Sequence, residues 1–274
     1  MDYYKSTIPI FDPDVSVDFD GLNPANATKG YVERDYAKYP EAMFAPPDQM
    51  TLIPEGDRDA YYDEQEQQES SLEHLYLSGP GGTPAFEFLD QNGFPDCWCH
   101  STCHSGMFDR LRRFMPVVRY NAVAIATMLK ETQGGWCGLS AKFARTEGFP
   151  EIGTGPGQWP YQSRKGKDTP ELRANMARYK ITEDWVDLTR QVYDQNLTNK
   201  QLWTCLFSNI PCPVDFNWWG HSVCAVRYVR ISAGEWGLLI LNSWQGWGRY
   251  GLGVLRGSKM IPNGAVATRL TGGV

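Results

Sequence analysis

The hydrophobic positions of this 274-residue chain are distributed differently in its two halves. Between residues 97 and 209 the signals are helical, and between residues 221 and 257 apolar, β-branched runs alternate with Gly-containing turns. We expect helices at 97–115, 120–132, 139–150, 169–180 and 197–209, and strands at 221–231, 235–244 and 249–257. Helices followed by a strand-rich half indicate an α+β fold with a cleft where the halves meet.

Capping residues indicate where two of these helices begin. Asp96 is a candidate N-cap for the helix that starts at Cys97, and Ser140 is a candidate N-cap for the helix in 139–150. The stretch Gly148 to Pro150 is a stop signal for that second helix.

Residues 1–80 lack the regular pattern of the remainder. In residues 1–50 scattered Pro, Asn and Asp break helices and strands, although the aromatic residues are too many for an ordinary disordered tail. A strongly acidic helix is expected over 55–77, followed by a linker over 78–84. We therefore expect an extended N-terminal arm with one helix, 1–80, and a main domain, 81–274. The domain divides into a helical part at about 85–180 and a β-rich part at about 205–260.

The net charge of −6 conceals an asymmetry between arm and domain. Residues 1–80 hold 17 acidic and 5 basic residues, whereas residues 81–274 hold 15 acidic and 21 basic residues. The arm could therefore lie along its own domain or along another basic surface, or its acidic segments could simply stay solvated. The basic residues form no stripe and the pI is about 5.3, which argues against nucleic-acid binding.

Composition also bears on the compartment. No run of eighteen apolar residues predicts a membrane span, and the acidic start is unlike a secretory leader. Seven cysteines are an odd number, which favours reduced thiols in a cytosol-like compartment over a disulfide framework.

Three cysteines and two histidines lie within the stretch DQNGFPDCWCHSTCHSG, residues 90–106. One hypothesis is a zinc site, because Cys99 and Cys103 are four residues apart, as are His100 and His104. On a helix, however, the two pairs point about 100° apart, and no second Cys-x-x-Cys or His pair exists elsewhere. We therefore expect no metal and no other cofactor, and favour a cysteine nucleophile.

A thiol attacks a carbonyl as a thiolate, so it needs a lowered pKa and a nearby imidazole. Cys97 lies at a predicted helix N-terminus, where the helix dipole favours negative charge. His221 heads one predicted strand and Asn242 ends the next, so antiparallel pairing would bring the imidazole and the carboxamide together.

At these residues the sequence resembles the papain-like cysteine peptidases. Gln91 precedes Cys97 by six positions and Trp98 follows it, as in that family. HSVCAV at His221 resembles the family's His strand, and NSWQGWG at Asn242 resembles its Asn-Ser-Trp motif with one residue fewer. The segment GGWCGLSAKFARTEGFP resembles its Gly-Gly-aromatic substrate-binding stretch. His221 and Asn242 follow Cys97 by 124 and 145 residues, close to the family's separation.

The resemblance covers about residues 85–257 and implies a cysteine peptidase or amide hydrolase acting on an extended peptide or protein. Cys97 would be the nucleophile, His221 the general acid and base, and Asn242 the residue that orients the imidazole. The Gln91 amide and the Cys97 backbone N–H would hold the oxyanion. The substrate-binding residues implied are Gly134, Gly135, Trp136, Trp98 and Trp244.

Four positions depart from the family pattern. Phe94 stands where a disulfide cysteine is usual, Pro95 replaces a glycine and narrows the cleft, and Asp96 adds negative charge beside the thiol. His100 replaces a usual aromatic residue. The arm also lacks the long helix of the family's inhibitory propeptides, although an extended arm could still cross the cleft.

These departures leave an alternative open. The chain could be a weakly active or non-catalytic scaffold in a virion or other large assembly, docked on a capsid or particle through residues 1–80. An active enzyme predicts that His221 lies within hydrogen-bonding reach of the Cys97 sulfur and that the cleft beside Gly134 and Gly135 is open. A scaffold predicts a filled cleft.

Overall fold

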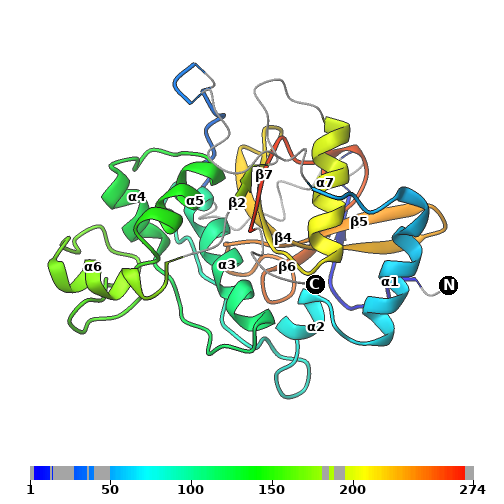
Figure 1. The fold of residues 1–274 in the computed structure, drawn as a ribbon, viewed down its shortest axis with the longest axis horizontal. Helices are drawn as coiled ribbons and strands as arrows, with labels where there is room; N and C mark the ends of the chain where they lie inside the picture. The colour runs from blue at the N-terminus through cyan, green and yellow to red at the C-terminus, as the bar shows by residue number, and fades with distance from the viewer. Residues whose placement is uncertain are drawn as a thin grey trace.

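The computed structural model describes residues 3–12, 14, 28–35, 37–39, 50–180, 185–187 and 195–268, with the side chains of 185–187, 195–198 and 268 excepted. Two lobes lie side by side, one helical and one built on a sheet, and helix α3 runs between them (Figure 1). The α+β fold class is therefore confirmed.

The helical lobe follows the expected elements closely. Its helices are α3 (Cys97–Arg112), α4 (Ala122–Leu129), α5 (Cys137–Thr146) and α6 (Pro170–Ala177). Asn121 caps α4 by accepting from the Ala124 N–H, and Thr169 caps α6 by accepting from the Leu172 N–H. Twelve of the sixteen residues of α3 are buried, so this helix is the core of the interface between the lobes.

Two expected caps are wrong. Ser140 lies inside α5, which starts three residues earlier because the Asp215 carboxylate accepts the Cys137 N–H at 3.1 Å and satisfies that helix end. Asp96 occupies the N-cap position of α3 but its side chain makes no capping bond. Its carboxylate instead receives the Arg164 guanidinium at 2.9 and 3.0 Å.

In the second lobe, the described residues form a seven-stranded sheet with the order β1-β6-β5-β4-β3-β7-β2. Its strands are β1 (Ile10–Phe11), β2 (Trp185–Asp187), β3 (Cys212–Phe216), β4 (His221–Ser232), β5 (Glu235–Leu241), β6 (Leu252–Leu255) and β7 (Gly264–Thr268). A short 3₁₀ turn, η4 (Ser258–Met260), precedes β7, and α7 (Gln195–Phe207) packs on β4. Cys224 pairs with Leu241 in the antiparallel β4–β5 ladder, which places His221 beside the residue that follows β5.

The N-terminal arm begins as an edge strand of this sheet. Residues 3–12, here called the N-terminal anchor, pair through β1 in parallel with β6. Phe11 lies against Trp247, with ring centroids 4.9 Å apart, and Asp12 pairs with Arg256 at 3.0 Å. The anchor therefore completes the sheet and part of its core.

The acidic part of the arm also packs on this lobe, as the acidic anchor, residues 55–77. The single expected helix is instead three pieces: η3 (Glu55–Asp57), α1 (Arg58–Gln67) and α2 (Leu72–Tyr76). The helix is interrupted between α1 and α2 by Glu69, whose φ of 49° is left-handed. Ser71 then caps α2 by accepting a hydrogen bond from the His74 N–H.

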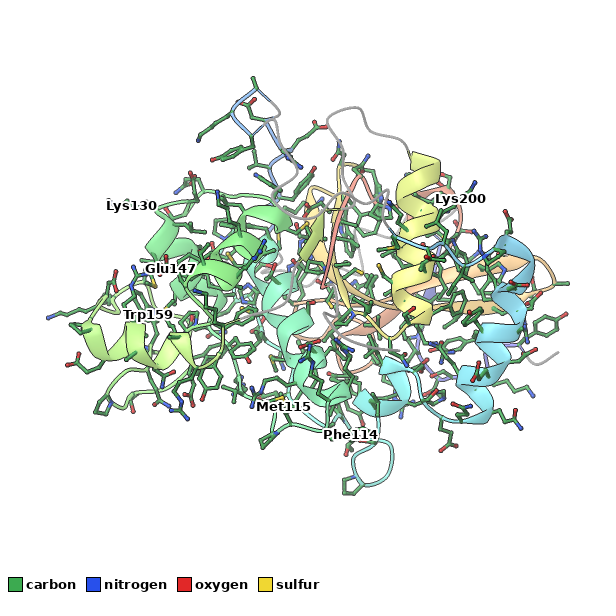
Figure 2. All side chains as sticks on the ribbon, in the orientation of Figure 1. Phe114, Met115, Lys130, Glu147, Trp159 and Lys200 are labelled. Carbon is green, nitrogen blue, oxygen red and sulfur yellow. The ribbon has the colours of Figure 1, made fainter. Side chains whose placement is uncertain are left out.

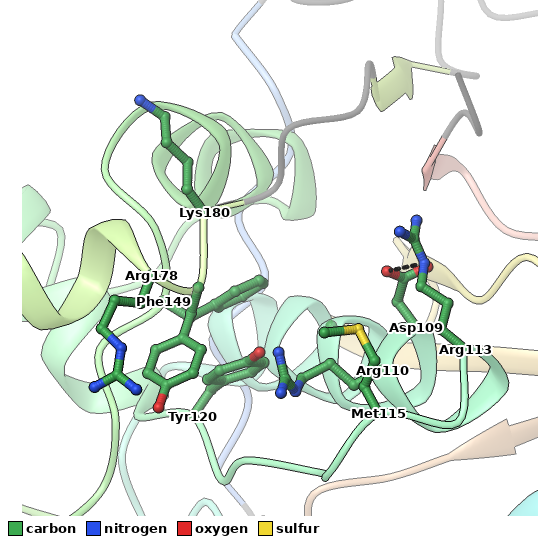
Figure 3. A pocket seen from close by; sticks show the side chains of 10 residues that line it. Asp109, Arg110, Arg113, Met115, Tyr120, Phe149, Arg178 and Lys180 are labelled. Carbon is green, nitrogen blue, oxygen red and sulfur yellow. Dashed lines mark ion pairs between the residues drawn. The ribbon is translucent and has the colours of Figure 1, made fainter. Parts of the chain in front are cut away.

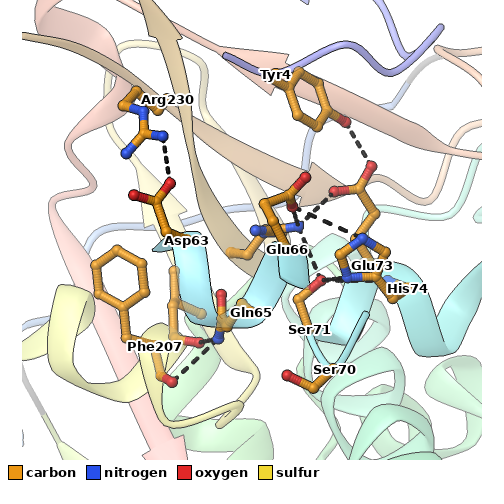
Figure 4. Close-up of polar contacts among 12 residues, drawn as sticks. Tyr4, Asp63, Gln65, Glu66, Ser70, Ser71, Glu73, His74, Phe207 and Arg230 are labelled. Carbon is orange, nitrogen blue, oxygen red and sulfur yellow. Dashed lines mark hydrogen bonds and ion pairs between the residues drawn. The ribbon is translucent and has the colours of Figure 1, made fainter. Parts of the chain in front are cut away.

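Two buried arginines of β4 hold the acidic anchor (Figure 4). Arg227 pairs with Glu66 at 2.8 Å and Glu73 at 3.2 Å. Arg230 pairs with Asp59 at 2.7 Å and with Asp63, and both guanidiniums lie over the Tyr62 ring. Four carboxylates of the acidic anchor are thus paired with two arginines of the domain on which it packs.

Two further expectations concern the cysteines and membrane-spanning helices. All seven cysteines are buried free thiols. Within the described ranges, no helix combines the length and the apolar character needed to cross a bilayer.

Candidate active site

Cys97 lies at the first position of α3, at the seam between the two lobes, and is completely buried. Burial raises the pKa of its thiol to about 12, although hydrogen bonds from the backbone of Ser222 and Gly30 oppose the shift. The sulfur is therefore a neutral thiol in this structure. One of the two residues whose backbone hydrogen-bonds to the sulfur, Gly30, belongs to the N-terminal arm.

His221 and Asn242 meet where β4 begins and β5 ends. His221 Nε2 lies 2.8 Å from Asn242 Oδ1, and the Ser243 N–H also donates to that oxygen at 2.7 Å. Because a carboxamide oxygen only accepts, Nε2 carries the ring proton and Nδ1 holds a lone pair. Nδ1 is buried and has no hydrogen-bond partner, so thiol and imidazole are not bonded to each other here. An active enzyme was expected to have His221 within hydrogen-bonding reach of the Cys97 sulfur, and this hydrogen bond is not formed in the state described.

Two tryptophans enclose the imidazole. Trp244 stacks on His221 with ring centroids 4.1 Å apart, and Trp219 meets it edge-on at 4.9 Å. This burial lowers the pKa of His221 to about 3, while the Asn242 hydrogen bond acts in the opposite direction. The sequence indicates only that Trp219 is a core or cleft-wall residue, because a tryptophan next to a turn carries no chemical signature.

Gln91 is held in place by the segment that follows Asn242. Its backbone N–H donates to the Ser243 carbonyl at 2.7 Å, and its side-chain oxygen accepts the Ser243 hydroxyl at 3.1 Å. The side-chain amide is thereby turned outward as a donor. It donates to the carbonyl oxygens of Phe94 and of Thr28, the latter at 2.7 Å. The expected oxyanion donor thus already holds a carbonyl oxygen of the arm.

Residues 28–35, here called the strap, lie along the cleft as an extended chain. Gly135 donates to the Gly30 carbonyl at 2.9 Å and accepts from the Val32 N–H at 2.8 Å. On the other lobe the Tyr31 N–H donates to the Gly220 carbonyl at 3.3 Å. The strap therefore bridges both walls through its main chain, with Tyr31 and Gly135 bridged in parallel.

Close packing explains the glycine at position 30. A Cβ atom there would lie 2.1 Å from the Pro95 carbonyl oxygen, so no side chain fits. Beyond it, Arg34 lies over the Trp136 ring at 4.8 Å and Tyr39 meets the same ring at 5.8 Å. Pro95 thus narrows the cleft at the place where the strap has no side chain.

Asp96 and Asp215 set the charge around the thiol. Burial raises the pKa of Asp96 to about 6, against the hydrogen bond and charge of Arg164. The Asp96 carboxylate, which was expected to place negative charge beside Cys97, therefore pairs with the Arg164 guanidinium. Asp215 on β3 was missed, because its role depends on tertiary contacts: it accepts the Ser222 hydroxyl and the Cys137 N–H, linking the two walls beneath the sulfur.

The remaining expected substrate-binding residues lie at different depths. Gly134 and Gly135 form the wall that the strap contacts, and Trp136 is 6% exposed beneath Arg34. Trp98 is fully buried behind Gly135, where an added Cβ would come within 2.7 Å of its ring. Trp98 therefore supports this wall from behind.

The histidines of the zinc hypothesis make other contacts. His104 Nε2 accepts the Leu89 N–H at 2.8 Å, and His100 Nδ1 bonds the Asp96 carbonyl at 2.9 Å. In the part of the chain that the structure describes, no group of three or more His, Cys, Asp or Glu side chains is placed to hold a metal ion.

Comparison with solved structures identifies the fold. The chain is similar to xylellain, a cysteine protease from Xylella fastidiosa, with 16% identity and a TM-score of 0.57, covering 90% of this chain and 97% of that one. It is similar to the procathepsin L2 proteinase of the Tenebrio molitor larval midgut, with 16% identity and a TM-score of 0.60, covering 93% and 83%. It is also similar to procathepsin B S9 from Trypanosoma congolense, with 15% identity and a TM-score of 0.54, covering 89% and 86%.

The chain thus has the papain-like fold of cysteine proteases, which confirms the expected fold. No protein-family profile matches the sequence, and no curated protein is similar to it by sequence.

Proposed function

We propose that this protein is a cysteine peptidase, or a related amide hydrolase, whose cleft is closed by its own strap in the state described. The observation that carries the proposal is the main-chain pairing of the strap with Gly135 and Gly220 on either side of Cys97. A peptide substrate lying in the same place would find the same donors and acceptors. The fold of its structural neighbours supports the same reaction class.

In the open state the strap would leave and water would reach the thiol. The pKa of Cys97 would then fall, because burial is the main cause that raises it. His221 Nδ1, which has a lone pair and no partner, would accept the thiol proton, while Asn242 keeps the ring oriented through Nε2. The thiolate would attack the scissile carbonyl.

The Gln91 amide would stabilise the oxyanion that forms. It already donates to the Thr28 carbonyl oxygen, which stands in for a substrate carbonyl in the closed state. His221 would next protonate the leaving amine, and water would hydrolyse the thioester to release the second product. The seven free thiols suit a reducing compartment, which we propose as the site of action.

The test combines a release variant with two site variants. Gly30→Leu should expel the strap, because the new side chain would clash with the Pro95 carbonyl. Gly56→Leu is the matched control, because a Cβ atom added at this arm glycine would meet no other atom within 4 Å. We expect Gly30→Leu to react at Cys97 with a thiol-directed electrophile and to hydrolyse a fluorogenic peptide library, and Gly56→Leu to behave as wild type. Adding Cys97→Ala or His221→Ala to Gly30→Leu should lower hydrolysis by at least about 10³-fold.

The alternative of a non-catalytic scaffold is favoured by one observation: the cleft is filled and Cys97 is fully buried. On that alternative the released variant would label Cys97 no faster than the buried core thiols Cys205 and Cys224. Such a result, with the fold intact by circular dichroism, would exclude the peptidase proposal.

A further inference from the structure

A second pocket lies at the opposite end of α3 from Cys97. It has a volume of about 180 Å³ and is lined by residues of α3, of the loop after it, and of the turn that follows α6. Arg110 is 13 positions after Cys97 on the same helix, so the two places are about 20 Å apart. This pocket is therefore separate from the cleft.

The lining is strongly basic. Four cations line the pocket against a single carboxylate: Arg110, Arg113, Arg178 and Lys180 against Asp109. Asp109 is already paired with both Arg112 and Arg113. Among the described residues, no carboxylate lies within ion-pair distance of Arg178 or Lys180. Figure 3 shows Arg113 turned toward Asp109 and Lys180 pointing away from the other cations. Arg110 reaches the pocket from α3 and Arg178 from the turn that follows α6.

Aromatic rings fix two of these cations in place. The guanidinium carbons of Arg110 and Arg178 each lie 5.6 Å from the centroid of the Tyr179 ring, so they are no more than about 11 Å apart. Arg110 Nε also donates to the Pro116 carbonyl at 2.7 Å. Behind them Tyr120 and Phe149 stack at 4.2 Å and are almost fully buried, which makes a rigid floor.

A structural explanation accounts for part of this charge. The helices α3 and α6 both end here, and cations near helix C-termini are stabilised by the helix dipole. That explanation does not require cations from α3 and from the turn after α6 to line one hollow, where they repel one another. An anion bound between them would relieve that repulsion.

We infer that this pocket binds a phosphate group. Its volume of about 180 Å³ leaves room for a phosphate group and lies below the roughly 300–1,000 Å³ of typical drug-sized ligand pockets. Arginine guanidiniums recognise phosphate oxygens by paired, charge-assisted hydrogen bonds. The phosphate could be carried by a soluble ester or by a lipid headgroup.

The neighbouring surface separates those two sources. Phe114 is 88% exposed at φ 55°, and Met115 beside it is 44% exposed and lines the pocket. Both project at the end of α3 (Figure 2). A lipid headgroup would bring acyl chains to Phe114, whereas a soluble ester would leave that ring in water.

The test measures binding of inorganic phosphate and of phenyl phosphate to the full chain by calorimetry and thermal shift, with chloride at matched ionic strength as reference. We expect saturable binding in wild type and a loss of affinity of roughly 10-fold or more in Arg178→Gln and in Arg110→Gln, since each removes a charged donor. Arg249→Gln, an arginine outside the pocket, should bind as wild type. Arg178 is exposed at the end of α6, so its replacement leaves the fold intact.

Vesicles of phosphatidylcholine with and without phosphatidic acid identify the source. If the protein sediments with the vesicles that contain phosphatidic acid, and Phe114→Ser weakens this sedimentation, the phosphate belongs to a lipid headgroup. If the protein does not sediment but binds phenyl phosphate, and Phe114→Ser leaves this binding unchanged, the phosphate belongs to a soluble ester. Absence of saturable binding by either phosphate probe, or equal binding by the Arg178→Gln variant and wild type, would overturn the inference.

Discussion

The strap and the two anchors belong to the same N-terminal arm but are held by different kinds of contact. The strap is held by main-chain hydrogen bonds across the cleft and by exposed side-chain hydrogen bonds to Asn217, and four of its eight residues are largely exposed. The acidic anchor is held by two arginines that are each 1% exposed, and it buries Tyr62, Leu72 and Tyr76 completely. A part held by main-chain bonds can leave without unfolding the domain, whereas a part that completes the core cannot.

Magnitudes support this distinction. Each main-chain hydrogen bond contributes a net of about 1 kcal/mol, so the few bonds of the strap hold it by roughly 3–4 kcal/mol. Breaking a buried ion pair by removing one partner costs roughly 3–5 kcal/mol for a single residue. The described parts of the arm therefore differ: the strap lies over the cleft through a few bonds, whereas the N-terminal anchor and the acidic anchor are packed into the domain.

The largest expected effect lies in the acidic anchor. Arg227→Ala would leave the buried carboxylate of Glu73 without its guanidinium, so the free energy of unfolding should fall by roughly 3–5 kcal/mol. Urea unfolding followed by circular dichroism measures it. Arg249→Ala, whose described contact is with the neighbouring Tyr250 ring, should change stability by less than about 0.5 kcal/mol. If both variants unfold alike, the acidic anchor is only a loosely attached surface.

The N-terminal anchor should show the next largest effect. Phe11 is 9% exposed and packs on Trp247, which in turn lies 6.0 Å from Trp219 beside His221. Phe11→Ala should lower the free energy of unfolding by about 3 kcal/mol. Ile10→Ala, on the exposed side of the same strand, is the matched control. Equal stability of the two variants would show that this strand is not part of the core.

The strap should respond in accessibility rather than in stability. Arg34→Ala removes the guanidinium from the Trp136 ring, a contact of roughly 1 kcal/mol, and should raise the rate of Cys97 labelling by about 5-fold. Because the strap is closed in the folded state, the free energy of unfolding should fall by no more than that contact contributes, roughly 1 kcal/mol. Lys38→Ala, a nearby exposed cation of the arm, should label as wild type. A large loss of stability in Arg34→Ala would contradict the separation of strap from anchors.

The sequence predicts these regions to different degrees. The papain-like fold and the pairing of His221 with Asn242 could be predicted from the sequence, because the motifs that carry the resemblance need particular residue types in a particular order. The sequence left open that an extended arm could cross the cleft, but not which residues do so, because the strap pairs through main-chain atoms and Gly30 has meaning only once Pro95 lies against it.

The same limit applies to the elements that were missed. The strand β3 contains Pro213 and two polar or sulfur-containing residues, and β7 is short and rich in small residues, so neither has a clear alternating pattern. Ser71, which caps α2 after the break, also accepts a hydrogen bond from the buried Arg227 guanidinium at 2.9 Å, a contact that no local propensity encodes. Contacts across large sequence separations are thus what the sequence alone leaves undetermined.

The smallest expected effect is a pH dependence confined to the acidic anchor. Burial and the charge of Arg227 lower the pKa of His74 below its ordinary value of 6.5. As the pH falls below 6.5, the unfolded chain binds a proton at His74 that the folded chain does not, so His74 contributes a loss of stability on acidification. His74→Gln should remove that contribution, and its free energy of unfolding should fall less than that of wild type between pH 7.5 and 5.5. Cys97 labelling in wild type and His74→Gln should remain equal across this range, because the strap does not contact His74. A pH dependence of unfolding that is identical in the two proteins would show that the acidic anchor does not sense protonation at this histidine.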